Sequence, residues 1–368
     1  MKHRYAAIAT ASLITLALSA GPALATSNSG PAHPGHSPSV TELASGLISP
    51  LKVAFGPNGS YLVAESFAGQ LTRVSANGTK TVVVSAPGQE IAGVSYAYGT
   101  TYYFNNDMGT GPEPGAVNLP TRLMSIDHRG KTRTIADLSK FEAANNPDGK
   151  TMYGVRGASA DCLAQAPYMQ AAGEVFSHPY STSPAWGGVY VGDAGANNIV
   201  YVSNSGKVKL VRQLPAEPVK IDGTVAGIFA QMGMTIPDCM MGMTYYAQPV
   251  PTDVEVSGAW IYYTVLPGVP AEMLGVGKVY RTNLFSGRTE VVASGLQAPT
   301  GVAVSRSGTV YVAQLMGDGV SVVKHGKVTN VLPAAMASDV EVSGNTMAAL
   351  TNALAETGGS LVTTRLRW

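Results

Sequence analysis

The stretch Ala298-Pro299-Thr300-Gly301-Val302-Ala303-Val304 opens the most regular copy of a pattern that recurs along the chain. It is followed by Val310-Tyr311-Val312-Ala313-Gln314 and by two further apolar runs over 319–323 and 327–332. Short runs rich in Val and Tyr, separated by Gly, Asn and Ser, are typical of β-strands joined by tight turns. This stretch therefore predicts a sheet of four short antiparallel strands.

The same pattern recurs elsewhere in the chain. A second clear copy covers 49–84, weaker copies begin at Ile91, Pro251 and Ser338, and a copy around 189–193 keeps its second to fourth strands. A lone four-stranded sheet buries too little surface to persist, but sheets packed radially cover one another. We therefore predict an all-β fold, a six-bladed β-propeller of four-stranded blades. A seven-bladed ring with a degenerate blade in the middle of the chain and a pair of β-sandwiches are the alternatives.

The two ends of the chain fit together in this scheme. The last copy has three predicted strands, the third over 360–367. The segment 41–50 closely repeats 289–299, which is the fourth strand and exit of another copy. We expect the N-terminal segment to supply the fourth strand of the last blade and so to close the ring.

The first residues have the three parts of a secretory signal peptide. Residues 2–4 are basic, residues 6–18 are apolar, and Ala23-Leu24-Ala25 offers a cleavage site. We expect residues 1–25 to be removed after Ala25 and the protein to be secreted, with no membrane span left after cleavage. An uncleaved membrane anchor is the alternative, although it would need a longer apolar run.

The rest of the chain divides into a leader and one domain. Residues 26–39, with several Pro and Gly, are typical of a flexible leader. Residues 40–368 form the predicted propeller domain, and insertions interrupt its pattern around 104–120, 140–188 and 215–249.

Charge limits the classes of partner. Charged residues make up 13% of the chain and the formal net charge is +1, so no overall attraction to nucleic acid or to an anionic membrane is expected. We expect a monomer that binds a small-molecule or extracellular ligand.

The two cysteines, Cys162 and Cys239, lie in different insertions. An oxidising compartment favours a disulfide between them, although two free thiols or a shared metal site would have the same sequence. Such a bond would join the two insertions, which we expect to meet over the mouth of the ring.

Methionines gather around Cys239, within residues 232–243. Thioether and thiolate sulfurs suit Cu(I), but methionine is also an adaptable filler of apolar cores. We favour packing, because the segment has no strict Met-x-x-Met repeat: the pattern occurs once, at 240–243.

Three runs carry a likeness to a known family: Pro251-Thr252-Asp253-Val254, Leu266-Pro267-Gly268 with Gly277-Lys278-Val279-Tyr280-Arg281, and Asn145-Asn146-Pro147-Asp148-Gly149. They resemble the ScyD/ScyE family of exported propellers, which are related to NHL-type repeats and are encoded with the scytonemin pigment pathway of cyanobacteria. The likeness covers most of 40–368. It implies the fold and export and brings no catalytic residues, and the inserts 154–168 and 225–246 depart from the family pattern.

Polar residues recur at two equivalent positions of the copies. The position just inside the first strand holds Lys52, Gly93, Asp253, Gly301 and Asp339. The position at the end of the second strand holds Glu65, Asn106, Asp193, Val265 and Gln314. Both positions border one mouth of the central channel, so we expect a single polar funnel there, formed by Lys52, Glu65, Asn106, Asp193, Asp253 and Asp339.

The funnel has two interpretations. Several carboxylate and amide oxygens around one point would hold Ca²⁺. Alternatively, these groups tie neighbouring blades together by hydrogen bonds, which is the commoner role of buried polar side chains and the one we favour.

No P-loop, HExxH, Gly-x-Ser-x-Gly or dinucleotide fingerprint occurs in the sequence. His178, which precedes Pro179 in a loop, is the histidine best placed to face a site. We predict a binding or scaffold propeller with its ligand at the loop-capped mouth of the channel. A divalent-cation-dependent propeller enzyme of the lactonase or lyase type is the alternative.

Overall fold

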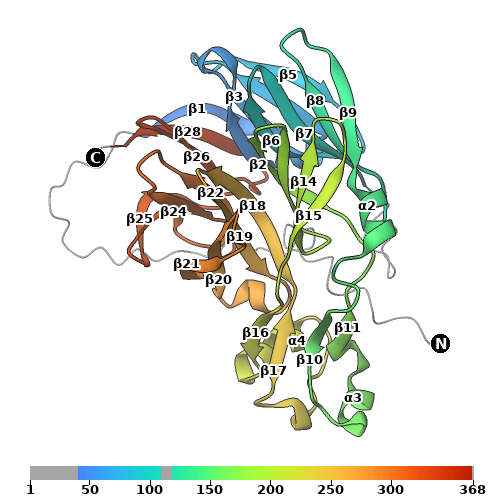
Figure 1. The fold of residues 1–368 in the computed structure, drawn as a ribbon. Coiled ribbons are helices and arrows are strands. Elements are labelled where there is room, and N and C mark those ends of the chain that lie inside the picture. Colours follow the sequence, from blue (N-terminus) through green and yellow to red (C-terminus); the bar gives the residue numbers. More distant parts are fainter. Residues whose placement is uncertain (1–39, 109–117, 367–368) are drawn as a thin grey trace, which may run out of the picture.

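The computed structural model describes residues 40–108 and 118–366, and strands dominate it (Figure 1). The predicted signal peptide (1–25) and leader (26–39) lie outside the described residues, as does most of the first predicted insertion. In the described part of the chain, no helix is long and apolar enough to cross a membrane.

Five sheets consist of four consecutive antiparallel strands, the order expected of a propeller blade. They are blade 1, β2 (Pro50–Phe55), β3 (Tyr61–Glu65), β4 (Gln70–Val74) and β5 (Lys80–Ser85); blade 2, β6 (Gln89–Ala97), β7 (Thr100–Asp107), β8 (Thr121–Ile126) and β9 (Thr132–Asp137); blade 3, β12 (Pro179–Ala185), β13 (Gly188–Asp193), β14 (Asn198–Ser203) and β15 (Val208–Gln213); blade 4, β18 (Pro249–Ser257), β19 (Trp260–Pro267), β20 (Gly277–Asn283) and β21 (Thr289–Leu296); and blade 5, β22 (Pro299–Val304), β23 (Val310–Gln314), β24 (Gly319–Lys324) and β25 (Lys327–Pro333).

The sixth sheet of this kind joins the two ends of the described chain. Blade 6 consists of β26 (Asp339–Ser343), β27 (Thr346–Thr351), β28 (Gly359–Arg365) and, as its fourth strand, β1 (Val40–Leu47). β1 runs antiparallel to β28, with Thr41 opposite Thr363 (Figure 1). Leu47 is fully buried at the end of β1. The predicted closure of the last blade by the N-terminal strand is confirmed.

The repeated sequence at the exits of β1 and β21 has a conformational reason. Ser49 and Ala298 both adopt left-handed φ angles, 46° and 47°, and each follows a left-handed glycine by three residues, Gly46 or Gly295. The chain therefore leaves both outer strands through the same turn and enters the next blade at Pro50 or Pro299.

The blades form a ring. Their first strands contact one another in a closed cycle, from β2 to β6, β12, β18, β22, β26 and back to β2. A buried apolar cluster lies between each pair of neighbouring blades, as Val53 and Leu361 illustrate for blades 1 and 6. These clusters bury both faces of every sheet, which a single blade cannot do. The predicted β-propeller class is confirmed.

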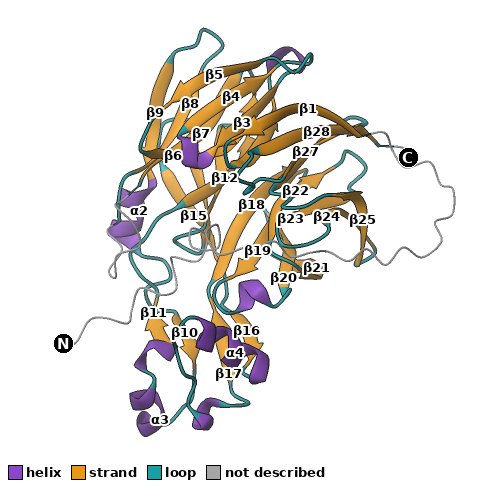
Figure 2. Ribbon diagram, turned by 180° about the vertical axis from the view of Figure 1, so that it is seen from behind, coloured by secondary structure: helices purple, strands orange, loops and turns teal. Residues whose placement is uncertain are grey.

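A seventh four-stranded sheet lies outside this cycle. It has the order β11 (Gln170–Ala172), β10 (Met152–Val155), β17 (Thr244–Ala247) and β16 (Glu217–Lys220), so it combines strands from two insertions. With α3 (Ala160–Gln165) and α4 (Gly223–Gln231) it forms what we call the insertion unit, residues 152–172 and 217–247. We expected the insertions to meet over the mouth of the ring; they do meet, but the unit projects away from the ring (Figures 1 and 2).

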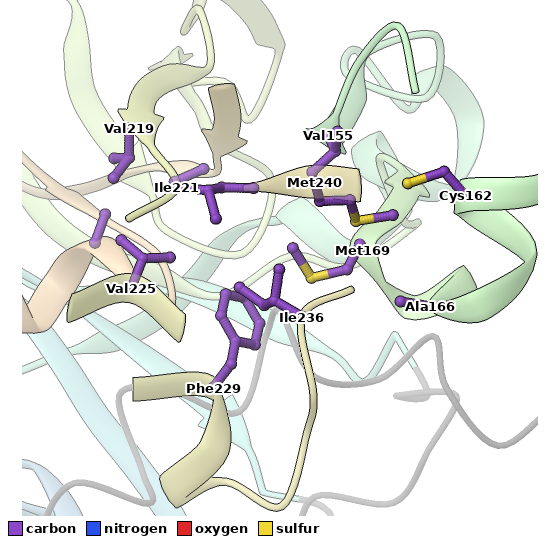
Figure 3. Close-up of a cluster of buried hydrophobic side chains, with 12 residues drawn as sticks. Val155, Cys162, Ala166, Met169, Val219, Ile221, Val225, Phe229, Ile236 and Met240 are labelled. Atoms are coloured by element: carbon purple, nitrogen blue, oxygen red, sulfur yellow. The ribbon is translucent and has the colours of Figure 1, made fainter. Parts of the chain in front are cut away.

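The predicted disulfide between Cys162 and Cys239 is confirmed, and it links the two halves of the insertion unit. Behind it lies an apolar cluster that includes Met169, Phe229 and Met240, all buried (Figure 3). Met240 therefore serves packing, and Cys239 is not available as a thiolate ligand. This is the packing role that we favoured, and Met234 and Met243 are partly buried against the same cluster, whereas Met232 and Met241 are exposed.

Candidate functional site

The six residues predicted to form one polar funnel are all buried, but they belong to three separate hydrogen-bonded groups. Lys52, Asp253 and Asp339 form the first group. Asn106 and Asp193 belong to a second group with Glu90 and His178. Glu65 belongs to a third group, in which its carboxylate accepts a hydrogen bond from the backbone nitrogen of Ile48, just before blade 1. Each side chain is thus held by its nearest backbone and strand neighbours, and the single polar funnel stays a prediction.

The first group crosses the axis of the ring. Lys52 on β2 places Nζ 2.9 Å from Oδ1 of Asp253 on β18, and 3.4 Å from Oδ1 of Asp339 on β26. The same Nζ donates a hydrogen bond to the carbonyl oxygen of Thr300 on β22, at 2.7 Å. One ammonium group thus links four first strands and fills the centre of the ring.

Each aspartate of this group also ties neighbouring first strands together. Oδ2 of Asp253 accepts a hydrogen bond from the backbone nitrogen of Val302 on β22, and Oδ2 of Asp339 accepts one from Val53 on β2, both at 2.7 Å. These bonds satisfy strand groups that would otherwise be buried without partners. The geometry gives Asp253 and Asp339 the structural role that we favoured.

Burial lowers the pKa of Lys52, but the charges of Asp253 and Asp339 more than offset it, so the pKa is raised. The lysine is therefore an ammonium ion that neutralises part of a negative cluster. Its Nζ also lies 5.6 Å from the centre of the Tyr180 ring, a favourable distance for a cation and an aromatic face.

Two further carboxylates face this group along the same strands. Glu255 follows Asp253 on β18, and Glu341 follows Asp339 on β26, two residues on in each case. Burial and the charge of Asp253 raise the pKa of Glu255 to about 8. Burial and the charge of Glu255 raise the pKa of Glu341 well above its ordinary value. The channel therefore holds more carboxylates than its one lysine can neutralise.

The second group lies where first strands begin and second strands end, which is the end of the ring that we call the mouth. Nε2 of His178 is 2.6 Å from Oε2 of Glu90, and that oxygen also accepts a hydrogen bond from the amide of Asn106 at 2.9 Å. Asp193 accepts hydrogen bonds from the backbone nitrogen of His178 and from the hydroxyl of Ser177, at 2.7 and 2.6 Å. Asp193 therefore positions the loop that carries His178.

His178 is the part of this group that reaches the surface, because 17% of its side chain is exposed whereas Glu90 is buried. Burial lowers the pKa of His178, but the charge of Glu90 more than offsets it, so the pKa of His178 is raised. In the same way, burial raises the pKa of Glu90, and the charge of His178 lowers it by more. The two groups form an ion pair at the mouth.

Glu65 has a local structural role. It accepts a hydrogen bond from the backbone nitrogen of Ile48 at 2.6 Å and another from the hydroxyl of Thr72. Gln314 occupies the same place in blade 5 and binds the backbone nitrogen of Gln297 and the hydroxyl of Ser321. At this position a side chain fastens the loop that enters its own blade.

An apolar cluster lies beside the ion pair. It consists of Leu51, Tyr180, Ala194, Val250 and Ala353, with Leu315 and Leu354 partly buried against it. These residues come from the beginnings of first strands and the ends of second strands in five blades, so they lie around the mouth. The backbone nitrogen of Ala194 donates to the carbonyl oxygen of His178 at 3.0 Å, which joins the cluster to the ion pair.

A three-ligand metal site is not assembled within residues 40–108 and 118–366, where no three His, Cys, Asp or Glu side chains are arranged to hold one ion. The oxygens of Asp253 and Asp339 face the Lys52 ammonium. Asp193 and Asn106 are engaged with the His178 loop.

Four participants were missed in the sequence: Glu90, Tyr180, Glu255 and Glu341. Glu90 stands opposite Asn106 in the register, at the place that Pro50, Pro179 and Pro299 occupy in other blades. A carboxylate in place of a repeated proline was the available signal. For the glutamates the signal was the pentapeptide Asp-Val-Glu-Val-Ser, which occurs at both 253–257 and 339–343.

The ring, its buried axis and its loop-bordered mouth define the class of this protein as a β-propeller. No family model matches the sequence, and no curated protein is similar to it.

Similar solved structures show the same architecture at low sequence identity. A gluconolactonase from Xanthomonas campestris has a TM-score of 0.53 and 12% identity, over 89% of each chain. Regucalcin, a calcium-binding protein from Agrobacterium tumefaciens, has a TM-score of 0.51 and 13% identity, over 89% of this chain and 94% of that one. A protein of unknown function from Bacteroides thetaiotaomicron has a TM-score of 0.52 and 11% identity, over 89% of this chain and 75% of that one. These likenesses concern the fold alone.

Proposed function

We propose that the protein is an exported binding propeller, similar in kind to the ScyD/ScyE proteins, that takes up a small ligand at the mouth of its channel. The observation that carries this proposal is the partly exposed His178–Glu90 ion pair beside the apolar cluster of Tyr180. The disulfide supports export, because such bonds persist in oxidising compartments.

The surroundings of His178 favour a ligand with an apolar body and a hydrogen-bonding edge. Small-molecule sites are mostly apolar and carry few polar groups, which fix the orientation of the ligand. Phe176 packs edge-on against the imidazole of His178, with ring centres 6.1 Å apart, and partly buried Leu315 and Leu354 extend the apolar surface of the mouth. A hydroxylated aromatic compound matches this combination.

A thermal-shift screen tests the proposal. Purified mature protein is heated with hydroxylated aromatic acids, alcohols and sugars, because a ligand that binds the folded state raises its unfolding midpoint. We expect at least one hydroxylated aromatic probe to raise the midpoint of the parent and to leave His178→Gln unchanged. Glu356→Gln alters an exposed residue at the same end of the ring and should behave as the parent. The proposed site would be contradicted if no probe raised the unfolding midpoint of the parent, or if the active probe raised the midpoint of His178→Gln by the same amount.

The alternative, a divalent-cation-dependent enzyme of the lactonase or lyase type, is favoured by the excess of carboxylates in the channel. If Ca²⁺ bound there, it would raise the unfolding midpoint of the parent but not that of Glu255→Gln, and lactone hydrolysis would depend on Ca²⁺. An unfolding midpoint that neither Ca²⁺ nor Mg²⁺ changes would contradict the enzyme alternative and favour the binding function.

A further inference from the structure

The end of the ring opposite the mouth is built from the turns that join first to second strands and third to fourth strands. We call it the hairpin face. Hydrogen bonds tie its turns on blades 3 and 4 to the outer strand of the preceding blade, β9 or β15. Arg133 donates to the carbonyl oxygen of Asn204 at 3.3 Å, and Arg212 donates to that of Gly287 at 3.5 Å. The turns of blades 3 and 4 are therefore each fixed to the blade before them.

Blades 2, 3 and 4 each carry one aromatic side chain at the tip of a turn. The exposed fractions are 83% for Tyr98 on blade 2, 91% for Trp186 on blade 3 and 89% for Phe285 on blade 4. Single exposed apolar residues are ordinary, but three nearly fully exposed aromatic rings on consecutive blades are not required by the packing of the ring. They indicate a surface that becomes covered.

Turns of the hairpin face are also basic. The turns joining third to fourth strands in blades 2 to 5, together with the turn joining first to second strands in blade 5, carry Arg129, Lys131, Lys207, Arg288, Arg306, Lys324 and Lys327, all exposed. Two carboxylates of the described chain lie at these turns. Asp127 accepts hydrogen bonds from the backbone nitrogens of Arg129 and Lys131 at 2.9 Å each, and Glu290 forms an ion pair with Arg288 at 2.8 Å, so the cations outside this ion pair are in the turns of blades 2, 3 and 5.

The opposite end of the ring has the opposite charge. In blades 1, 3, 4, 5 and 6 the loops joining second to third strands contain no Lys or Arg. Their acidic residues are the exposed Asp318 and Glu356 and the buried Glu272, whose pKa burial raises to about 8. A net charge of +1 therefore conceals a separation of charge between the two ends. An anionic surface would attract the hairpin face and repel the mouth.

We propose that the hairpin face docks on the surface of a bilayer containing anionic lipids. Trp and Tyr are favoured at the headgroup level because their rings are apolar and carry a polar edge. Lys and Arg near an anionic leaflet add electrostatic attraction. Docking in this orientation directs the mouth and the insertion unit away from the membrane, so the proposed ligand site stays open.

Vesicle cosedimentation tests this docking directly. The mature protein is mixed with phosphatidylcholine vesicles that contain one-fifth phosphatidylglycerol, and with vesicles of phosphatidylcholine alone. We expect binding to the anionic vesicles, weakened in high salt because the attraction is screened. The triple variant Tyr98→Asn, Trp186→Ser and Phe285→Ser should bind at least tenfold more weakly, as should the charge reversal Lys207→Glu with Lys327→Glu.

Phe67→Ser is the matched control, because Phe67 is an exposed aromatic residue in a loop at the mouth end and should leave vesicle binding unchanged. Far-UV circular dichroism and the unfolding midpoint show that each variant is folded. Equal binding by the triple variant, or no binding to anionic vesicles, would overturn the proposal. Stronger binding to soluble polyphosphate than to anionic vesicles would also overturn it, in favour of an acidic polymer.

Discussion

Asp253 and Glu255 lie two residues apart on β18, and Asp339 and Glu341 lie two apart on β26, so each pair lies on one side of its strand. The aspartates face the Lys52 ammonium and accept hydrogen bonds from backbone nitrogens, but burial outweighs these contacts and raises the pKa of both, that of Asp339 to about 8. For the glutamates, the nearby charges that act on the pKa are mostly negative, which favours the protonated carboxyl. The channel therefore retains protons at pH values where exposed glutamates have lost them.

This retention predicts a pH dependence of stability. The folded-state pKa of Glu255, about 8, is above its unfolded value, so the folded protein binds more protons between these values. The free energy of unfolding should therefore fall as pH rises from about 5 to about 8. Glu255→Gln removes this titration, so its unfolding midpoint should change less over the same range and exceed that of the parent at pH 8.5 by a few degrees.

The measurement is a series of thermal unfolding curves from pH 5 to pH 9 for the parent, for Glu255→Gln and for Glu356→Gln. Glu356 is exposed, so its variant should follow the parent. Parallel curves for the parent and Glu255→Gln would mean that Glu255 is ionised in the folded state.

The sequence identified the candidate site residues by their equivalent positions in the repeats, and not by the groups that they contact. Equivalent places in the repeats located Lys52, Asp253 and Asp339, which do meet at the axis. The sequence could not separate them from Glu65 and Asp193, because loop geometry decides which backbone nitrogen each carboxylate reaches. Glu90 escaped detection because blade 2 has a glutamate where blades 1, 3, 4 and 5 have a proline.

At the scale of elements, the insertion unit is the part that the repeats could not predict. The two halves of the unit, residues 152–172 and 217–247, pair through β10 (Met152–Val155) and β17 (Thr244–Ala247). Both strands are short and lack the sequence pattern that the blades repeat. Pairing between segments that are far apart in the chain leaves no local sequence pattern that could predict it. The cysteines were the available signal, because a disulfide requires its two segments to meet.

Replacing Cys239 by Ser tests how far this unit depends on its cross-link. The cysteines are 77 residues apart, and closing a loop of that length contributes about 4 kcal/mol in the chain-entropy model. Most of this contribution should act on the insertion unit, because the blades are held by their own apolar clusters. Cys239→Ser should therefore be cleaved faster by a protease within the unit.

Limited proteolysis followed by intact-mass measurement locates the cleavage sites. They should fall within 152–172 or 217–247, while the ring stays intact and keeps its strand-rich circular dichroism. Cleavage that begins in the blades would show that the disulfide supports the ring itself.

At the scale of the whole molecule, the fold could be predicted largely from the sequence. Each blade repeats the same alternation of apolar residues and turn glycines, because each meets the same two neighbours in the ring. The turns that follow β1 and β21 both require a left-handed residue, Ser49 or Ala298, which explains why the sequences of the two segments are similar. The projection of the insertion unit away from the ring was not predictable, since it depends on contacts between segments that share no repeat.

Closure of the ring by β1 is the central claim, and two truncated proteins test it most directly. One begins at Val40 and keeps β1, and the other begins at Ile48 and lacks it. Without β1, the buried Leu47 and Ala44 are lost and the edge of β28 is exposed. The protein that begins at Val40 should melt as the mature protein does, and the one that begins at Ile48 should melt about 10 °C lower or aggregate. Equal unfolding midpoints for the two proteins would contradict closure by the N-terminal strand.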